Sequence, residues 1–110
     1  MELMNLQKLK EMVKSMLNFE IMFIIRPDLT EREIHNKLFD VRSYISGDGG
    51  KVIKEDVWGT RNLAYEIDGY YKGIYCLTSF DADNTVIRIL DNRIREDKDI
   101  MSHIIIQKCG

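Results

Sequence analysis

The side chains that most often perform chemistry are few in this sequence, and they are not grouped. The two cysteines, Cys76 and Cys109, are far apart and form no C-x-x-C pair, so their spacing supports neither a disulfide framework nor a zinc site. The two histidines, His35 and His103, stand alone, and an isolated histidine is more often structural or solvated than a metal ligand. We therefore expect no metal site and no cofactor.

Residue patterns typical of an enzyme are also missing from the sequence. No Ser/His/Asp order and no glycine-rich phosphate loop occur at a useful spacing. The glycine cluster at residues 47–50 follows a predicted helix, whereas phosphate-binding loops precede one, so it indicates a turn. Asp97 and Asp99 are typical of a solvated loop rather than of a general acid and base. The sequence predicts a protein that is not an enzyme and has no small-molecule substrate.

A group of tyrosines is the one aromatic cluster with a functional interpretation. Tyr70, Tyr71 and Tyr75, with Lys72 among them, have the aromatic and basic composition that stacks on single-stranded bases. They lack the glycine-flanked aromatic pair of sheet-based RNA-binding modules, and tyrosines in a hairpin also pack against each other across strands. Both interpretations stay open.

Length and composition limit the class of protein. A chain of 110 residues is long enough for one core, and its 45% hydrophobic and 31% charged residues are typical of a folded globular domain. The longest apolar run, Ile21–Ile25, is far shorter than the ~20 residues that cross a bilayer, so we expect a cytoplasmic protein with no membrane partner. The formal net charge of -2 argues against binding nucleic acid through the whole surface, so any RNA contact must use local basic patches.

The first half of the chain predicts a strand, a helix and a long second strand. Residues 19–25 are aromatic and β-branched and end at Pro27, and their nearly continuous hydrophobicity indicates a central strand. Thr30 and Glu33 have the spacing of a capping box, which predicts a helix that begins there and ends at Gly47. A strand over residues 51–58 follows, with a bulge or bend at Gly59 before it resumes over residues 62–67.

The second half predicts a hairpin, a helix and a closing strand. Residues 68–73 are expected to form the hairpin loop and residues 74–80 its return strand. Asp83 or Asn84 should cap a helix that runs to Arg95, and residues 100–107 should form the last strand.

This order of elements is the split β-α-β arrangement of an α+β, ferredoxin-like domain. Right-handed crossovers then place both helices on one face of a four-stranded antiparallel sheet and leave the other face, or its edge, free for a partner. We assign the domain to residues 16–110. Residues 1–15 form an N-terminal extension with helical spacing of its leucines, and Met16 is an alternative start of the protein.

One segment resembles a family signature. Residues 59–67 read Gly-Thr-Arg-Asn-Leu-Ala-Tyr-Glu-Ile, which is similar to the pattern of bacterial small-subunit ribosomal protein number six: Gly, any residue, a basic residue, a polar residue, Leu, Ala or Ser, Tyr, any residue, Ile. The resemblance extends from residues 16–20, through the capped helix and Lys72-Gly73, to the last strand. The chain departs from the family at Asp68 and at Met101-Ser102, where the family tends to carry small or basic residues.

The resemblance implies a structural constituent of the small ribosomal subunit. Such a protein joins the central domain of small-subunit ribosomal RNA together with ribosomal protein number eighteen. With fewer basic groups in this chain, more of the binding is expected to rest on the protein partner.

The candidate contact residues follow from side-chain chemistry and from the signature. Arg61 is the leading RNA candidate, because a guanidinium can hold phosphate oxygens bidentately and the bend at Gly59 could aim it off the sheet. Secondary RNA candidates are Arg95, Lys51, Lys54 and Phe19, the last of which either stacks on RNA or packs in the sheet. We assign Leu63, Ala64 and Tyr65 to the fold and to the partner interface.

Two alternatives remain at the level of sequence. Another RNA-binding module of this topology would expose aromatic residues on its two central strands, and a small-ligand domain would need a pocket of converging polar groups. Neither alternative accounts for the signature at residues 59–67.

Overall fold

A computed structural model describes residues 16–108 of the chain and contains the predicted order of elements. Residues 1–15, with the expected extension, and Cys109 lie outside the described residues. The elements are β1 (Leu17–Ile25), α2 (Glu31–Ser46), β2 (Lys51–Ile67), β3 (Tyr70–Ala82), α3 (Asn84–Glu96) and β4 (Ile100–Gln107).

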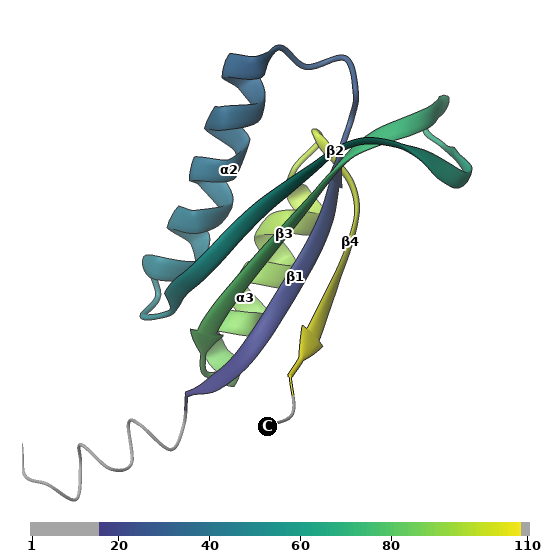
Figure 1. The fold of residues 1–110 in the computed structure, drawn as a ribbon. Helices are drawn as coiled ribbons and strands as arrows, with labels where there is room; N and C mark the ends of the chain where they lie inside the picture. Colours follow the sequence, from purple (N-terminus) through teal and green to yellow (C-terminus); the bar gives the residue numbers. More distant parts are fainter. Residues whose placement is uncertain (1–15, 109–110) are drawn as a thin grey trace, which may run out of the picture.

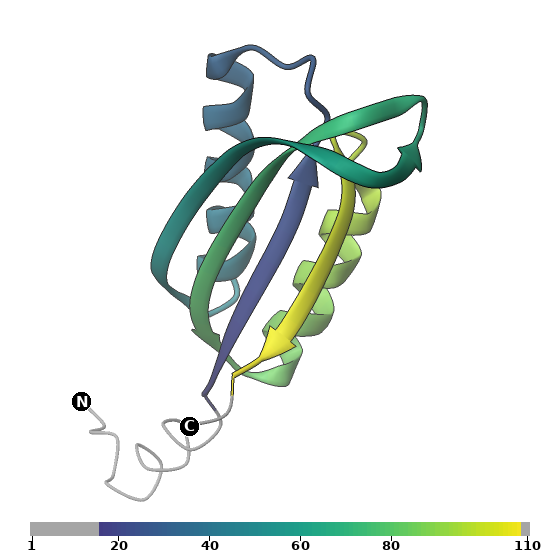
Figure 2. The ribbon, with the colours of Figure 1, turned by 45° about the vertical axis from the view of Figure 1, so that its right-hand side comes forward.

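The four strands form one antiparallel sheet in the order β2-β3-β1-β4. The apolar β1 is a central strand, as its sequence predicted, and β2 and β4 are the edges. Both helices cover the same face, and the opposite face carries no helix (Figures 1 and 2). The structure thus confirms the ferredoxin-like, split β-α-β fold.

The core lies between the helices and the covered face of the sheet. Every second residue of β1 from Phe19 to Ile25 is buried, as is every second residue of β3 from Ile74 to Ala82, because alternate side chains of a strand point to the same face. The helices contribute stripes spaced three or four residues apart, which are Val41 and Ile45 on α2 and Val86, Leu90 and Ile94 on α3. Ile34, Leu38 and Ile87 of the same helices are partly buried and pack against this core.

Local capping explains where the helices begin. The Thr30 hydroxyl accepts a hydrogen bond from the Glu33 amide at 3.2 Å, and the Glu33 carboxylate accepts one from the Thr30 amide at 3.0 Å, which is the predicted capping box. This bond from the Thr30 backbone lowers the pKa of Glu33. The Asp83 carboxylate caps α3 by accepting from the Val86 amide at 3.0 Å. Gly47 ends α2 with an ordinary right-handed φ of -64°, and the left-handed glycine is Gly49, at φ 99°.

The β2–β3 hairpin contains one confirmed and one incorrect prediction. Gly59 has a φ of 90°, and the pairing register shifts between Val57 and Gly59, so the predicted bulge is present. The loop is shorter than predicted, because Asp68 at φ 50° and Gly69 at φ 85° make a two-residue turn. Tyr70–Lys72 therefore belong to β3 and not to the loop.

A largely buried lysine ties the two helices together at one end of the sheet. Lys37 of α2 lies 2.6 Å from Asp97 and 3.2 Å from Asp99, which follow α3 in the chain. Burial acts to lower the pKa of Lys37, but its hydrogen bonds to the two carboxylates outweigh burial and raise that pKa. Asp97 is thus a buried ion-pair partner, which corrects the prediction of a solvated loop at this position.

Replacing Lys37 by Met should leave the Asp97 carboxylate without its cation, whereas Asp99 keeps its pair with Arg26. Removing one partner of a buried ion pair costs about 3–5 kcal/mol, and because Asp99 is partly exposed we expect a loss of about 3 kcal/mol in the free energy of unfolding. Urea titration followed by circular dichroism measures this loss. Lys98→Met, at an exposed position nearby, is the matched control. If Lys37→Met destabilised the domain no more than this control does, the network would have no role in stability.

Candidate functional site

The uncovered face of the sheet is apolar at its centre. Met22, Leu77, Trp58, Ile104 and Ile106, with Glu20 at one side, line a shallow hollow of about 350 Å³ that spans all four strands. Ile104 is 55% exposed, Ile106 53% and Trp58 45%. A contiguous exposed apolar patch on a folded domain commonly marks an interaction surface. We call these six residues the open-face patch.

Charged side chains at one end of this face are largely paired with each other. Lys54 lies 3.5 Å from Asp56, and Lys108 lies 3.0 Å from Glu20. Lys51 stands opposite Asp81 in the strand pairing. The two predicted RNA-binding lysines, Lys51 and Lys54, therefore lie at the start of β2 with acidic neighbours. The exposed Lys54–Asp56 pair is weak, so it leaves the Lys54 ammonium group free to exchange partners.

The signature segment forms a bulge at the far end of the hairpin. The strand pairing passes from Asn62 opposite Lys72 to Ile67 opposite Tyr70, so that four residues of β2, Leu63–Glu66, stand against Tyr71 alone. Such an excess of residues pushes a strand outward and bends it. Ala64 is exposed and Tyr65 is 72% exposed, whereas Leu63 is partly buried. The bulge presents Tyr65 to solvent and keeps Leu63 against the domain.

A glycine allows the hairpin to fold closely over the end of the sheet. Gly73 is buried, and a Cβ atom there would overlap Ile24 and lie 2.9 Å from the Met101 side chain and 3.4 Å from that of Leu63. Only a residue without a side chain leaves room for these three neighbours. Met101 thus packs against the hairpin, although its position drew attention in the sequence only because it departs from the family's basic residues.

Arg61 stands opposite Gly73, beside the bulge. Directly paired residues of antiparallel strands face the same side, so Arg61 and Gly73 share the side on which Ile24 lies. Arg61 is exposed, and within residues 16–108 it forms no ion pair. Its guanidinium is therefore available to an external acceptor next to Tyr65.

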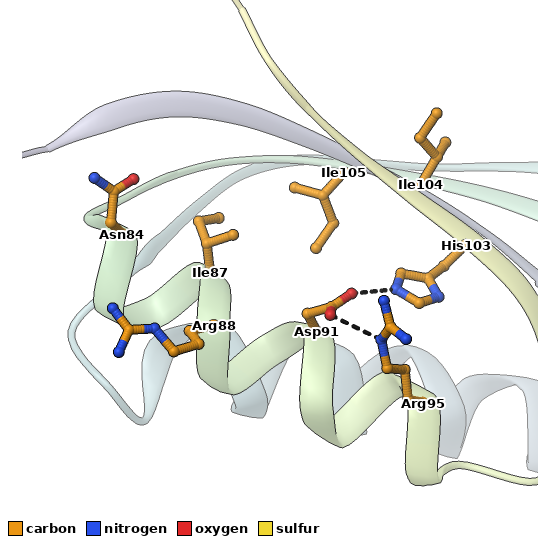
Figure 3. A pocket seen from close by; sticks show the side chains of 8 residues that line it. All are labelled: Asn84, Ile87, Arg88, Asp91, Arg95, His103, Ile104 and Ile105. Atoms are coloured by element: carbon orange, nitrogen blue, oxygen red, sulfur yellow. Dashed lines mark hydrogen bonds and ion pairs between the residues drawn. The ribbon is translucent and has the colours of Figure 1, made fainter.

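Arg95 lies in a groove between α3 and the edge strand β4 (Figure 3). Its Nε donates to one oxygen of Asp91 at 2.8 Å, and the other oxygen of Asp91 is 2.7 Å from Nε2 of His103. The pKa of Asp91 is lowered, and the hydrogen bond with His103 is the main cause. Burial raises this pKa and so opposes the effect, and the hydrogen bond from Arg95 lowers it further. Sequence reasoning did not group Asp91 with His103, because they come from different elements, twelve positions apart.

Phe19 is buried, which removes it from the RNA candidates. Its ring is 5% exposed and packs against Phe80 with a centroid distance of 5.8 Å, on the face that the helices cover. A base cannot reach a ring in this position, so the alternative of packing in the sheet is correct. The tyrosine cluster is also divided, since the Tyr70 hydroxyl donates to Asp28 at 3.0 Å and that of Tyr71 to Glu66 at 3.3 Å.

The structure therefore brings together some of the predicted site residues and separates others. Arg61 and the residues Leu63–Tyr65 lie side by side on the hairpin. Lys51 and Lys54 lie at the opposite end of β2, and Arg95 lies at the other edge of the molecule, beside β4. The open-face patch was expected as a free face, but its individual residues were not named.

The described part of the chain offers little else with catalytic or metal-binding character. Among residues 16–108, no three His, Cys, Asp or Glu side chains are placed to hold a metal ion together. Burial raises the pKa of the Cys76 thiol to about 12, so this thiol is a protonated part of the core. No described helix is long and apolar enough to cross a membrane.

Comparison with known proteins identifies relatives along most of the chain. Residues 18–107 match the family described as Ribosomal protein S6. The chain is 38% identical over 87 residues to the small ribosomal subunit protein bS6 of Natranaerobius thermophilus, an alignment that covers 79% of this chain and 91% of that protein. It is 40% identical over 88 residues to bS6 of Clostridium acetobutylicum, which covers 80% and 93%.

A solved structure agrees with these sequence relatives. The crystal structure of 30S ribosomal protein S6 from Thermotoga maritima superposes with a TM-score of 0.79 at 30% identity, over 84% of this chain and 88% of that one. From the fold, the family match and the relatives together, we conclude that the chain belongs to the ribosomal protein S6 family and is a non-enzymatic, structural component of the small ribosomal subunit in the cytoplasm.

Proposed function

We propose that the protein binds the central domain of small-subunit ribosomal RNA jointly with ribosomal protein number eighteen, and that the open-face patch holds the protein partner. The observation that carries this proposal is the uncovered, apolar face of the sheet, where Trp58 on β2 and Ile104 and Ile106 on β4 are each about half exposed. Burial of such surface by another protein is favourable, at roughly 25 cal/mol per Å² of apolar area.

The chemistry of this patch favours a protein over RNA as its occupant. RNA is bound mainly through cations that neutralise phosphates and through aromatic rings that stack on bases. The open-face patch has aliphatic side chains, one tryptophan and the acidic Glu20, and it contains no cation. The net charge of -2 also limits what the isolated protein can contribute to RNA affinity. An apolar centre with a charged rim is the usual anatomy of a protein–protein interface.

The hairpin supplies the RNA contact in this proposal. Arg61 is exposed, has no ion-pair partner among the described side chains, and stands next to the bulge that presents Tyr65. A guanidinium can hold two phosphate oxygens at once, and Tyr65 can contact either the RNA or the partner at the boundary between them. RNA and protein would then bind adjacent parts of one continuous surface.

Removing the apolar centre of the patch should weaken binding to the partner without unfolding the domain. Ile104→Ser combined with Ile106→Ser deletes two half-exposed side chains, and we expect affinity for protein number eighteen to fall by about 2–3 kcal/mol. Isothermal calorimetry measures the affinity, and sedimentation with small ribosomal subunits measures incorporation. Phe39→Ser is the matched control, because Phe39 is 62% exposed on α2, behind the sheet.

The two assays separate the possible failures. If the wild-type protein were recovered only in fractions free of ribosomal subunits, the proposed function would be wrong. If the wild type sedimented with subunits and the double variant bound the partner as well as Phe39→Ser does, the partner would bind elsewhere on the domain.

Replacing Arg61 should weaken RNA binding specifically. Arg61→Ala should reduce the affinity of the protein pair for RNA by about 1.5–3 kcal/mol, the usual contribution of a charge-assisted hydrogen bond. It should also lower the log-log salt slope by roughly 0.7–0.9, because one phosphate is no longer neutralised. Arg61→Lys should keep the slope but lose affinity if the contact is bidentate. Titration of RNA across a salt series, with melting temperatures matched, measures both quantities. Unchanged affinity and slope in a folded Arg61→Ala would show that this arginine does not contact RNA.

A further inference from the structure

The groove between α3 and β4 gathers cations on a chain whose net charge is negative. It has a volume of about 560 Å³ and is lined on the helix side by Asn84, Arg88, Asp91 and Arg95, whose spacing of three or four residues puts them on one face of α3. His103 and Ile105 line it from β4 (Figure 3). The groove contains two arginines and one aspartate, so its net charge is positive even when the histidine is neutral. The whole chain, by contrast, carries a net charge of -2.

The aspartate in the groove is fully occupied by its neighbours. One oxygen of Asp91 contacts His103 at 2.7 Å, and the other accepts a hydrogen bond from Arg95 at 2.8 Å. Because both carboxylate oxygens have a partner, their repulsion of an incoming anion is reduced. Because Asp91 holds Arg95 through Nε alone, both terminal amino groups of that guanidinium remain available for another acceptor. Asp91 thus holds the Arg95 guanidinium in an orientation that leaves its terminal amino groups available to a phosphate.

The second arginine of the groove is unpaired among the described residues. Arg88 is exposed and forms no ion pair within residues 16–108. It lies seven positions before Arg95, which corresponds to about 10 Å along the helix. Two guanidinium groups at this separation can each hold one phosphate of an extended backbone, whereas a single small anion reaches only one of them.

The position of the groove connects it with the open-face patch. Ile104 lines both the groove and the patch, because β4 is an edge strand with the groove along one side and the open face on the other. A polyanion in the groove would therefore lie directly beside a protein seated on the patch.

We propose that the α3–β4 groove binds two phosphates of the ribosomal RNA backbone through Arg88 and Arg95, with Asp91 as the positioning residue for Arg95. This inference rests on the proposed RNA binding and adds to it a second contact, on the side of β4 that faces α3, besides the contact of Arg61 on the hairpin.

The test uses the full chain with ribosomal protein number eighteen and a labelled transcript of the RNA central domain. Arg88→Gln and Arg95→Gln should each weaken RNA binding about 10-fold and together about 100-fold, and the pair should lower the log-log salt slope by roughly 1.5. Arg32→Gln, which removes an exposed charge on α2 outside the groove, is the matched control. A double variant that matched this control in affinity and slope would overturn the proposal.

The variant Asp91→Asn distinguishes positioning from net charge. This variant raises the charge of the groove by one, so a groove that acts only through its electrostatic potential would bind RNA more tightly. We expect binding about 3- to 10-fold weaker instead, since Arg95 loses its charged hydrogen-bond partner. Unchanged or tighter binding would overturn the positioning role, provided that the melting temperature shows a folded protein.

A competition experiment tests whether the ligand is an extended backbone. Inorganic phosphate, titrated at constant ionic strength, should not displace the transcript, because a single anion occupies only one arginine. Complete displacement at millimolar phosphate would assign the groove to a free anion and overturn the assignment to RNA. A wild-type protein pair that failed to bind the transcript at all would overturn both this inference and the proposed function, whereas normal binding by the double variant would overturn this inference alone.

Discussion

The central constraint on this domain is that its two helices cover only one of the two faces of its sheet (Figures 1 and 2). Both helices pack on the same face of the sheet, so the alternate residues of β1 and β3 that point toward them form the sheet side of the core. The residues between them point the other way, and several are just as apolar, including Met22 and Leu77. A domain of this size has no further element among its described residues to cover them. In the proposed function, the protein partner buries this second face.

A chain of polar contacts fixes the end of the sheet from which the hairpin extends. The Tyr70 hydroxyl donates to Asp28, Asp28 lies 3.7 Å from Arg26, and Arg26 pairs with Asp99 at 2.9 Å. Asp99 in turn contacts Lys37 of α2, so Tyr70, at the tip of the hairpin, is connected to this helix through the network. Most of these groups are too exposed for each pair to add much stability. Their combined effect is orientation, because the hairpin that carries Arg61 cannot move away from the domain without breaking the Tyr70–Asp28 hydrogen bond.

The features that could be predicted from the sequence are those set by neighbouring residues. The capping box of Thr30 and Glu33, the bulge at Gly59 and the bounds of β4 all depend on local spacing, and the structure contains each of them. The four-residue bulge at Leu63–Glu66 was not predicted, because it results from pairing with Tyr71 across the hairpin. Burial of Phe19 and the contact between Asp91 and His103 likewise depend on which elements become neighbours in space. The exposure of Tyr65 on this bulge is also a tertiary feature.

The distribution of charge clarifies how an acidic protein can belong to an RNA-rich particle. Nonspecific attraction to phosphate depends on total charge, but a specific contact depends on a few oriented cations, and desolvation at an interface strengthens each of them. Paired lysines such as Lys54 contribute little to the field at a distance, since Asp56 compensates them. The exposed guanidinium groups of Arg61 and Arg95 are local positive charges on a chain whose net charge is -2. A weak overall field disfavours adsorption to arbitrary RNA, so that in the proposed function stable binding requires the apolar face and the few cations to be satisfied together, which only the assembled site would offer.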